Sequence, residues 1–417
     1  MKIGYACVTL GVYGIKQRTC RIKNATPEHL KALIEANITT LDRTLDYNID
    51  HEIKLFRMSS GMIPFASSPM NTLRWWEIFS DRLKAIGQKA RDNGMRLSMH
   101  PGQYMVLNAI DEGVVSRAVE DLRYHARLMD AMGLGPENKM ILHIGGVYGD
   151  KDAATQRFIK QYRALEDTIQ KRLVIENDDR QYTIGEVLSI GEKEGIPVVF
   201  DHLHHQVNPD NTRSEKAWIA ACEKTWTAID GPQKIHYSQQ DHSKRPGAHS
   251  ATIHLPQFLE FYNNLENHEM DIMLEVKDQN LSAIKCINVL AWPKIKRLEK
   301  EWARYKYWVL EHSVKEYKAI RQLLKDKQAY PVIDFYSLIE EAMEKPVTTG
   351  SAVNTAQHIL GYFKASADIK TKQDFEKKRQ KISSGGSPKE MKRFLLKLSL
   401  GQYPYLVESL YFMEVFA

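Results

Sequence analysis

The chain has 417 residues, more than one domain usually holds, so its length predicts two domains or one large domain with an addition. Hydrophobic residues make up 43% and charged residues 26%, which excludes a disordered chain, and no run of 18 apolar residues predicts a membrane span. The net charge of +6 is uneven: residues 285–417 hold 24 basic and 15 acidic residues, whereas residues 1–284 hold 34 and 37. Because 13 of the 15 histidines also precede residue 285, we expect two domains with different roles, 1–284 and 285–417.

Up to about residue 280, short β-branched or apolar runs alternate with longer helical patterns. The predicted strands are Lys2–Cys7, Ile53–Ser59, Arg96–His100, Met140–Ile144, Leu173–Glu176, Pro197–Asp201, Lys234–Ser238 and Asp271–Val276. The predicted helices include Pro27–Tyr47, Leu73–Asn93, Val114–Met132 and Ala153–Gln170. This order and length match the α/β fold of a (β/α)8 TIM barrel, with a doubly wound open sheet as the alternative. No glycine-rich phosphate loop follows the first strand, so no nucleotide cofactor is expected.

After Lys277 the strand patterns stop, and the rest of the chain predicts helices. Residues 294–327 suggest one long charged helix that carries aromatic side chains, and further helices are expected over 334–345, 352–365 and 388–400. Lys381–Pro388 predicts a flexible loop. About 130 residues are enough to bury a separate core, so we expect a mostly α-helical C-terminal domain.

Potential metal ligands stand at or just after the ends of six consecutive predicted strands. They are His100, His143, Glu176, Asp201, His204, His236, His249 and Glu275. In a barrel the carboxyl ends of all strands meet at one mouth, so these side chains would share a pocket. Imidazole and carboxylate ligands without thiolate suit Zn, Mn, Fe or Mg, and this number predicts two or three ions. Each residue alone could instead be structural, as a hydrogen-bonded histidine or a helix N-cap.

Residues beside the predicted ligands suggest a nucleic-acid substrate. Gln103 and Tyr104 follow His100, where an amide and an aromatic ring could enter a base stack and replace pairing and stacking. Lys244 and Arg245 could contact phosphates. Both pairs could also be ordinary loop residues. Lys234 faces the barrel interior two residues before His236, and a lysine buried there would be neutralised or modified.

At these motifs the sequence resembles the ultraviolet-damage endonuclease family. The matching stretches, in family order over about residues 1–278, are IGYAC, LFRMSSGMIPFAS, RLSMHPGQY, ILHIGGVYGDK, VIENDDR, VVFDHLHHQVNP, KIHYSQQ, KRPGAHS and MLEVK. The resemblance implies a barrel related to endonuclease IV with up to three divalent ions, usually manganese, although Mg2+, Zn2+ or Co2+ would also suit. It implies incision of double-stranded DNA immediately 5′ of cyclobutane dimers, 6-4 photoproducts and, more weakly, abasic sites.

The resemblance also assigns roles to individual residues. The eight ligands named above would hold the ions, with Glu176 and Glu275 acting directly in catalysis. Gln103 and Tyr104 would probe the lesion, and Tyr5 would line the site. Lys234 corresponds to a family lysine that is carboxylated near the metals, and we expect it to act in catalysis with Glu176 and Glu275. One departure is Ser68, in Ala66-Ser67-Ser68-Pro69, because the family usually has a histidine ligand there. A serine is a poorer ligand, so we expect one metal position to be weaker.

The C-terminal part resembles the uncharacterised helical domain of YbgA-type proteins, in stretches such as YKYWVLEHSVKEYKAIRQLL and YPYLVESLYF. Its basic charge suggests that it binds the DNA backbone or another protein, and a solvated lysine-rich face is the alternative. Four scattered cysteines without a CxxC pair and the lack of a secretory h-region favour the cytoplasm. The alternative functions are an endonuclease acting mainly at abasic sites, a metal-dependent sugar isomerase or epimerase, and a lesion-binding protein without catalytic activity.

Overall fold

The computed structural model describes residues 1–102 and 104–416. Their contacts divide the chain into two compact units, one formed by residues 1–8 and 15–286, and one formed by residues 9–14 and the chain from 287 onward. The domain boundary expected after residue 284 stays a prediction, because contacts do not test whether each part folds alone. No helix among these described residues is long and apolar enough to cross a membrane.

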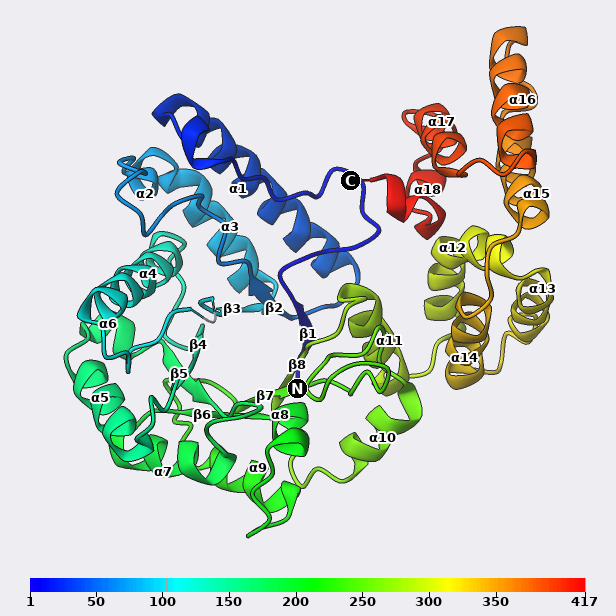
Figure 1. Ribbon diagram of the computed structural model, residues 1–417. Helices are drawn as coiled ribbons and strands as arrows, with labels where there is room; N and C mark the ends of the chain where they lie inside the picture. The colour runs from blue at the N-terminus through cyan, green and yellow to red at the C-terminus, as the bar shows by residue number, and fades with distance from the viewer. Residues whose placement is uncertain (103, 417) are drawn as a thin grey trace. The chain divides into compact units, whose positions relative to one another are not determined.

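The first unit is built around eight parallel strands that close into a barrel, with each strand paired to its neighbours in sequence order (Figure 1). The strands are β1 (Ile3–Ala6), β2 (Leu55–Met58), β3 (Arg96–Met99), β4 (Met140–His143), β5 (Leu173–Glu176), β6 (Val198–Asp201), β7 (Lys234–Tyr237) and β8 (Asp271–Leu274). The pairing of β1 with β8 closes the barrel, so the predicted fold class is confirmed and the open-sheet alternative is wrong.

The barrel interior is packed in layers. Ile141, Val174 and Val199 form a buried cluster from β4, β5 and β6, with Trp226 packed against it. Since side chains alternate between the two faces of a strand, the residues two positions further along also face inward. This places His143, Glu176 and Asp201, at the ends of the same strands, directly above this apolar cluster.

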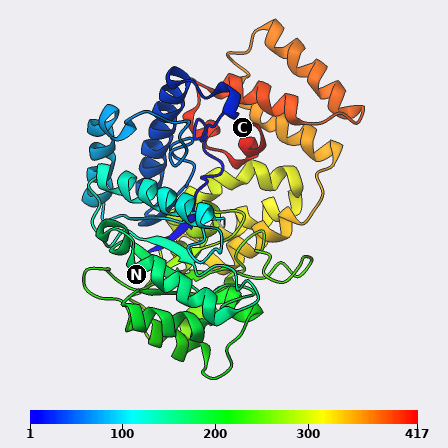
Figure 2. The same cartoon turned by 60° about the vertical axis from the view of Figure 1, so that its left-hand side comes forward.

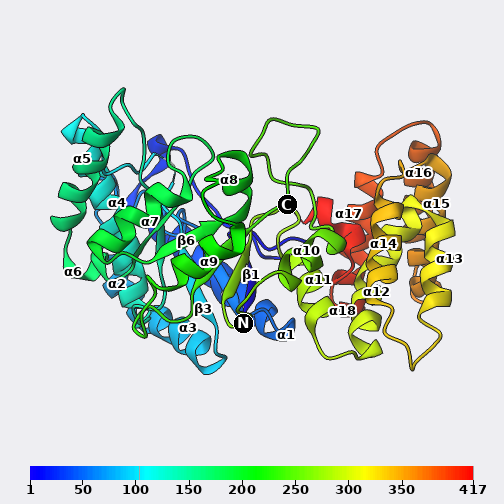
Figure 3. The same cartoon turned by 90° about the horizontal axis from the view of Figure 1, so that it is seen from below.

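Helices surround these strands, as the two rotated views also show (Figures 2 and 3). They are α1 (Pro27–Asp50), α2 (Trp75–Ile78), α3 (Ser80–Asp92), α4 (Glu112–Ala131), α5 (Lys151–Arg163), α6 (Asp167–Gln170), α7 (Ile184–Glu194), α8 (His202–Val207), α9 (Glu215–Glu223), α10 (Leu255–Asn263) and α11 (Asn280–Leu290), after the short 3-10 helix η1 (Ile22–Asn24). Two predicted helices are each split in two. Phe79 leaves the helical region between α2 and α3, and Glu166 is extended before α6.

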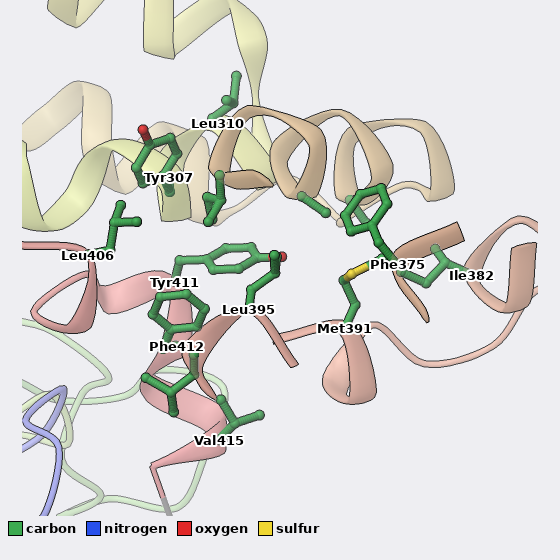
Figure 4. Packing of buried hydrophobic residues seen from close by; sticks show 14 of the residues in the cluster. Tyr307, Leu310, Phe375, Ile382, Met391, Leu395, Leu406, Tyr411, Phe412 and Val415 are labelled. Atoms are coloured by element: carbon green, nitrogen blue, oxygen red, sulfur yellow. The ribbon is translucent and has the colours of Figure 1, made fainter. Parts of the chain in front are cut away.

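The second unit is helical, as predicted. It contains α12 (Ile295–His312), α13 (Val314–Leu323), α14 (Val332–Met343), α15 (Thr349–Leu360), α16 (Ile369–Ser383), α17 (Lys389–Ser399) and α18 (Pro404–Val407), with the 3-10 helices η2 (Gly361–Phe363) and η3 (Leu410–Val415). Its core joins side chains of α12, α15, α16, α17, α18 and η3, and Figure 4 shows Tyr307, Leu395 and Phe412 in this packing.

Three predictions for the second unit are wrong in detail. The long helix expected over 294–327 is broken at Ser313, whose extended backbone (φ −153°, ψ 120°) separates α12 from α13. Helix α16 was not predicted, because its charged sequence buries only Phe375 and Ile382. Since α16 continues to Ser383, the loop expected over Lys381–Pro388 is also shorter than predicted.

Candidate metal centre

The carboxyl ends of the barrel strands bring the predicted ligands together. His143, Glu176 and Asp201 are the last residues of β4, β5 and β6, while His100 and Glu275 directly follow β3 and β8. Parallel strands with in-register pairing between His143 and Glu176, and between Asp201 and His236, hold these positions side by side. The convergence expected from the strand-end pattern is therefore present in the structure.

Asp201 and His204 are linked by a helix cap. The Asp201 side chain accepts a hydrogen bond from the backbone N–H of His204 at 2.7 Å, so that α8 begins immediately after β6. His204 Nδ1 donates to the backbone oxygen of Asn177 at 2.9 Å and lies 3.8 Å from Glu176 Oε1. The short strand-to-helix turn therefore directs two potential ligands to one centre.

Glu176 is the common neighbour of four histidines. Its Oε1 accepts a hydrogen bond from His236 Nδ1 at 2.7 Å and lies 3.8 Å from His204 Nδ1. Its Oε2 lies 3.5 Å from His100 Nε2 and 3.8 Å from His143 Nε2. With only 1% of its surface exposed, this carboxylate stands at the middle of the cluster.

Two groups of side chains have ligand atoms within 4.8 Å of one another and share Glu176. The groups are His100, His143 and Glu176, and Glu176, Asp201, His236 and Glu275. Buried oxygens that lack a hydrogen-bond donor among the described residues include Glu176 Oε2 and Asp201 Oδ2. Unpaired buried carboxylate oxygens are costly unless a cation meets them, so these residues fit divalent metal ions.

Arg57 is a part of the site that the sequence analysis missed. Its guanidinium lies 2.5 Å from Glu275 Oε1, and its Nη2 donates to His236 Nε2 at 2.9 Å. Because an arginine can only donate, this contact leaves His236 Nδ1 facing Glu176, Glu275 at 3.4 Å and Asp201 at 3.9 Å. A signal was present in the sequence, since Arg57 interrupts an apolar strand at a position that faces inward.

Burial and neighbouring charges shift the pKa values of the cluster residues in different directions. Desolvation, with Arg57 nearby, holds the pKa of both His100 and His236 well below the usual value, so both rings are neutral at pH 7. Desolvation and the neighbouring Asp201 and Glu275 raise the pKa of Glu176 well above its usual range. Desolvation opposes ionisation of Glu275 too, but Arg57 and the histidines outweigh it and hold its pKa well below normal.

Lys234 is buried at the start of β7, below the ligand layer and two residues before His236. Desolvation, followed by repulsion from Arg96 and Arg57, lowers the pKa of its amine well below the usual value. A neutral amine is a nucleophile, so the environment suits the modification that the sequence analysis expected.

The remaining predicted site residues lie further from the centre or outside the described residues. His249 Nε2 reaches to 3.9 Å from Glu275, whereas Gln103 lies outside the described residues. Tyr104 is 76% exposed. Tyr5 is fully buried, with its hydroxyl donating to Asn48 on α1, so the structure does not place it where DNA can touch it.

The predicted phosphate contacts and the unusual serine are on the surface. Lys244 pairs with Asp241 at 2.6 Å, and Arg245 lies 3.9 Å from Asp179, yet both basic side chains remain more than half exposed. Ser68 is half-buried in a turn, where its Oγ accepts from the backbone N–H of Met70 at 3.3 Å.

Comparison with known proteins assigns both parts of the chain. The family model described as UV-endonuclease UvdE matches residues 1–306, and the model of the protein of unknown function DUF1722 matches residues 306–415. A UV DNA damage endonuclease of Clostridium perfringens (strain 13 / Type A) is 39% identical over 351 residues, which cover 83% of this chain and 84% of that protein. A UV DNA damage endonuclease of Bacillus cereus (strain B4264) is 33% identical over 64% of this chain and 85% of that protein.

The barrel also has a solved relative. The crystal structure of SacUVDE superimposes with a TM-score of 0.65 at 39% identity, over 70% of this chain and 98% of that one. The resemblance found in the barrel motifs is therefore confirmed. The chain belongs to the UV-endonuclease UvdE family and continues into a helical region of the DUF1722 type.

Proposed function

We propose that this chain is a metal-dependent DNA-repair endonuclease that cuts the phosphodiester immediately 5′ of cyclobutane dimers and 6-4 photoproducts, and more weakly at abasic sites. Residues 1–284 would be the catalytic domain and residues 285–417 a separate helical domain. The observation that carries the proposal is the buried cluster around Glu176 at the barrel mouth, in a chain of the UvdE family. A substrate of UV-damaged DNA agrees with the name of these relatives, UV DNA damage endonuclease.

The cluster would bind two or three divalent ions, with manganese as the first choice. Its ligands would be His100, His143, Glu176, Asp201, His204, His236, His249 and Glu275. When bound, the ions would supply water activation and stabilise negative charge on the attacked phosphate and the leaving oxygen. The carboxylates of Glu176 and Glu275 both lie close to His236 Nδ1, at 2.7 Å and 3.4 Å, so the three side chains could hold one ion together.

Arg57 would keep this ligand geometry in place. By pairing with Glu275, it keeps this carboxylate ionised and holds it beside His236. Side chains that orient ligands in this way contribute substantially to metal affinity. Lys234, as a neutral amine, would react with carbon dioxide to form an N-carboxylate and release a proton, and Arg57 and Arg96 would offset the new negative charge.

DNA recognition would use the exposed residues at the mouth. Tyr104, with Gln103 beside it, would stack into the duplex where a damaged step is easy to open. Lys244 and Arg245 would contact phosphates, and their exposure leaves them free to do so.

A nicking assay tests the proposal. Duplexes that carry one defined photodimer, one abasic analogue or no lesion would be incubated with the full chain and manganese, with EDTA as the metal-free control. We expect one cut immediately 5′ of the dimer, with a 3′-hydroxyl and a 5′-phosphate, abolished by EDTA. Much faster cutting of the abasic duplex would favour an abasic-site endonuclease. Binding without a cut would indicate a lesion-binding protein, and ketose isomerisation with intact DNA would indicate an isomerase.

A further inference from the structure

The helical second unit contains a cleft of about 300 Å³, separate from the barrel mouth. It lies among α12, α17, η3 and the segment before α15. Its volume is at the lower end of the range for small-molecule sites, which suits a ligand with a single ring. The role of this unit is open, since the matching family is described only as a protein of unknown function.

Buried charges form the floor of the cleft. Glu311 is only 1% exposed, and its Oε2 accepts from Lys392 Nζ at 2.6 Å. Lys392, which is also buried, pairs with Glu414 Oε1 at 2.7 Å and lies over the ring of Tyr411 at 4.6 Å. Two carboxylates thus share one ammonium group, so the three side chains carry a net charge of −1.

Two buried polar atoms of this floor have no hydrogen-bond partner among the described residues. They are Glu311 Oε1 and the Tyr411 hydroxyl, and both residues line the cleft with 1% of their surface exposed. Leaving such atoms unpaired is costly in a fold whose other polar groups are mostly paired. Burial also raises the pKa of Glu311 although Lys392 opposes it, which shows that the one ammonium group does not fully offset the desolvation.

The other polar atoms of the cleft are mainly acceptors. His312 donates from Nδ1 to the backbone oxygen of Lys345 at 2.6 Å, so Nε2 of the neutral ring is an acceptor. The second carboxylate oxygen of Glu414 lies 3.7 Å from Lys389, whose exposed side chain is screened by water. Trp308, Leu410 and Met413 supply apolar surface beside these acceptors. The cleft therefore favours a ligand that brings N–H donors, a positive charge and an apolar stem.

We propose that the cleft bounded by Glu311, Lys392, Tyr411 and Glu414 binds a small organic cation, a protonated amine, amidine or guanidine attached to an aromatic or branched apolar group. The cationic head would meet the unpaired Glu311 oxygen and Glu414. The apolar stem would lie against Trp308 and Met413, where a tryptophan face also attracts a cation. The negative floor disfavours anions such as free phosphate or nucleotides.

Three probes of one shape but different charge test the ligand class. Benzamidine, benzamide and benzoate would be titrated calorimetrically into the manganese-loaded full chain. We expect benzamidine to bind at least tenfold more tightly than benzamide, and benzoate to show no binding. Equal heats for the three probes, or no benzamidine binding up to about 10 mM, would overturn the proposal.

Variants locate the binding. Glu311→Gln and Glu414→Gln should each weaken benzamidine binding at least about tenfold, because a charge-assisted contact is lost. Met413→Trp should weaken it similarly by filling the cleft, without changing its charge. Glu341→Gln, on the exposed side of α14, is the matched control and should bind like the wild type. If circular dichroism shows that Glu311→Gln does not fold, the variants Glu414→Gln and Met413→Trp decide the test, because both of these side chains are partly exposed. Wild-type affinity in both of those variants would place benzamidine elsewhere and refute the site.

Discussion

The two ends of the barrel differ in whether their buried charged groups have partners within the chain. At the amino ends of the strands, Arg96 pairs with Asp271 at 3.0 Å and donates to the backbone oxygens of Glu137, Asp230 and Pro232 at 2.7–2.8 Å. Lys139 and Arg172 are likewise held there by Asp230, Asp130 and nearby carbonyls. At the carboxyl ends, one buried carboxylate oxygen each of Glu176 (Oε2) and Asp201 (Oδ2) has no donor among the described residues.

This contrast separates stability from function within one unit. At the amino ends of the strands, which we call the lower end, the chain itself supplies partners for the buried charged groups. These charges therefore hold strands and loops together. The cluster around Glu176 at the carboxyl ends, which we call the upper end, combines neutral imidazoles with unpaired carboxylate oxygens. This arrangement costs folding free energy unless a cation completes it. A substitution at the upper end should therefore mainly affect metal binding and nicking, whereas one at the lower end should mainly affect folding stability.

The largest effect is expected at the upper end, from Glu176→Gln. An amide keeps the shape but removes the charge that both candidate metal groups share. Nicking should fall by more than the roughly 10–100-fold that loss of a supporting residue costs. Bound metal per chain, measured by inductively coupled plasma mass spectrometry, should fall as well. Thermal stability of the metal-free chain should stay equal or rise, because burial and like charges raise the pKa of Glu176. Unchanged metal content would remove Glu176 from the ligand set.

At the lower end, Arg96→Met should mainly destabilise the fold. The substitution leaves the buried carboxylate of Asp271 without its ion pair, a loss that typically costs about 3–5 kcal/mol. Denaturant unfolding measures this loss of stability. The double variant with Asp271→Leu is the control, because it removes the charge that was left alone. We expect it to recover part of the lost stability, and a fully additive loss would contradict the ion-pair explanation.

The sequence predicted the upper end better than the lower end for a physical reason. Histidines and carboxylates at strand ends are conspicuous, because strands otherwise end in apolar or turn residues, and convergence follows from the fold alone. Arg57 was not predicted as a site residue because its role depends on contacts with β7 and with the residue after β8, which are distant in the sequence. The burial of Tyr5 and the helix α16 were not predicted either, since tertiary packing decides both.

A smaller effect is expected at the surface beside the cluster, from Tyr104→Ala. An exposed ring that stacks on bases contributes about 1–3 kcal/mol, so affinity for a photodimer duplex should fall roughly tenfold or more. Tyr104→Phe keeps the ring and should bind nearly like the wild type. Metal content should be unchanged in both, which distinguishes DNA recognition from damage to the cluster. Equal affinity of the alanine and phenylalanine variants in fluorescence anisotropy would show that the ring does not stack.

The smallest effect is expected from Ser68→His, which would introduce the histidine ligand that the family resemblance leads us to expect at this position. Ser68 sits in a turn held by backbone hydrogen bonds from Ser68 to Phe65 and from Asn71 to Ser68, so the new ring changes little of the fold. If the serine weakens one metal position, the histidine should raise metal content toward one further ion per chain and change nicking by no more than about tenfold. Ser67→His is the matched control, because that neighbour instead donates to Asp121 at 2.9 Å on α4. A gain in both variants would mean that any added surface imidazole binds metal, and a gain in neither would mean that the upper cluster is complete without a ligand at position 68.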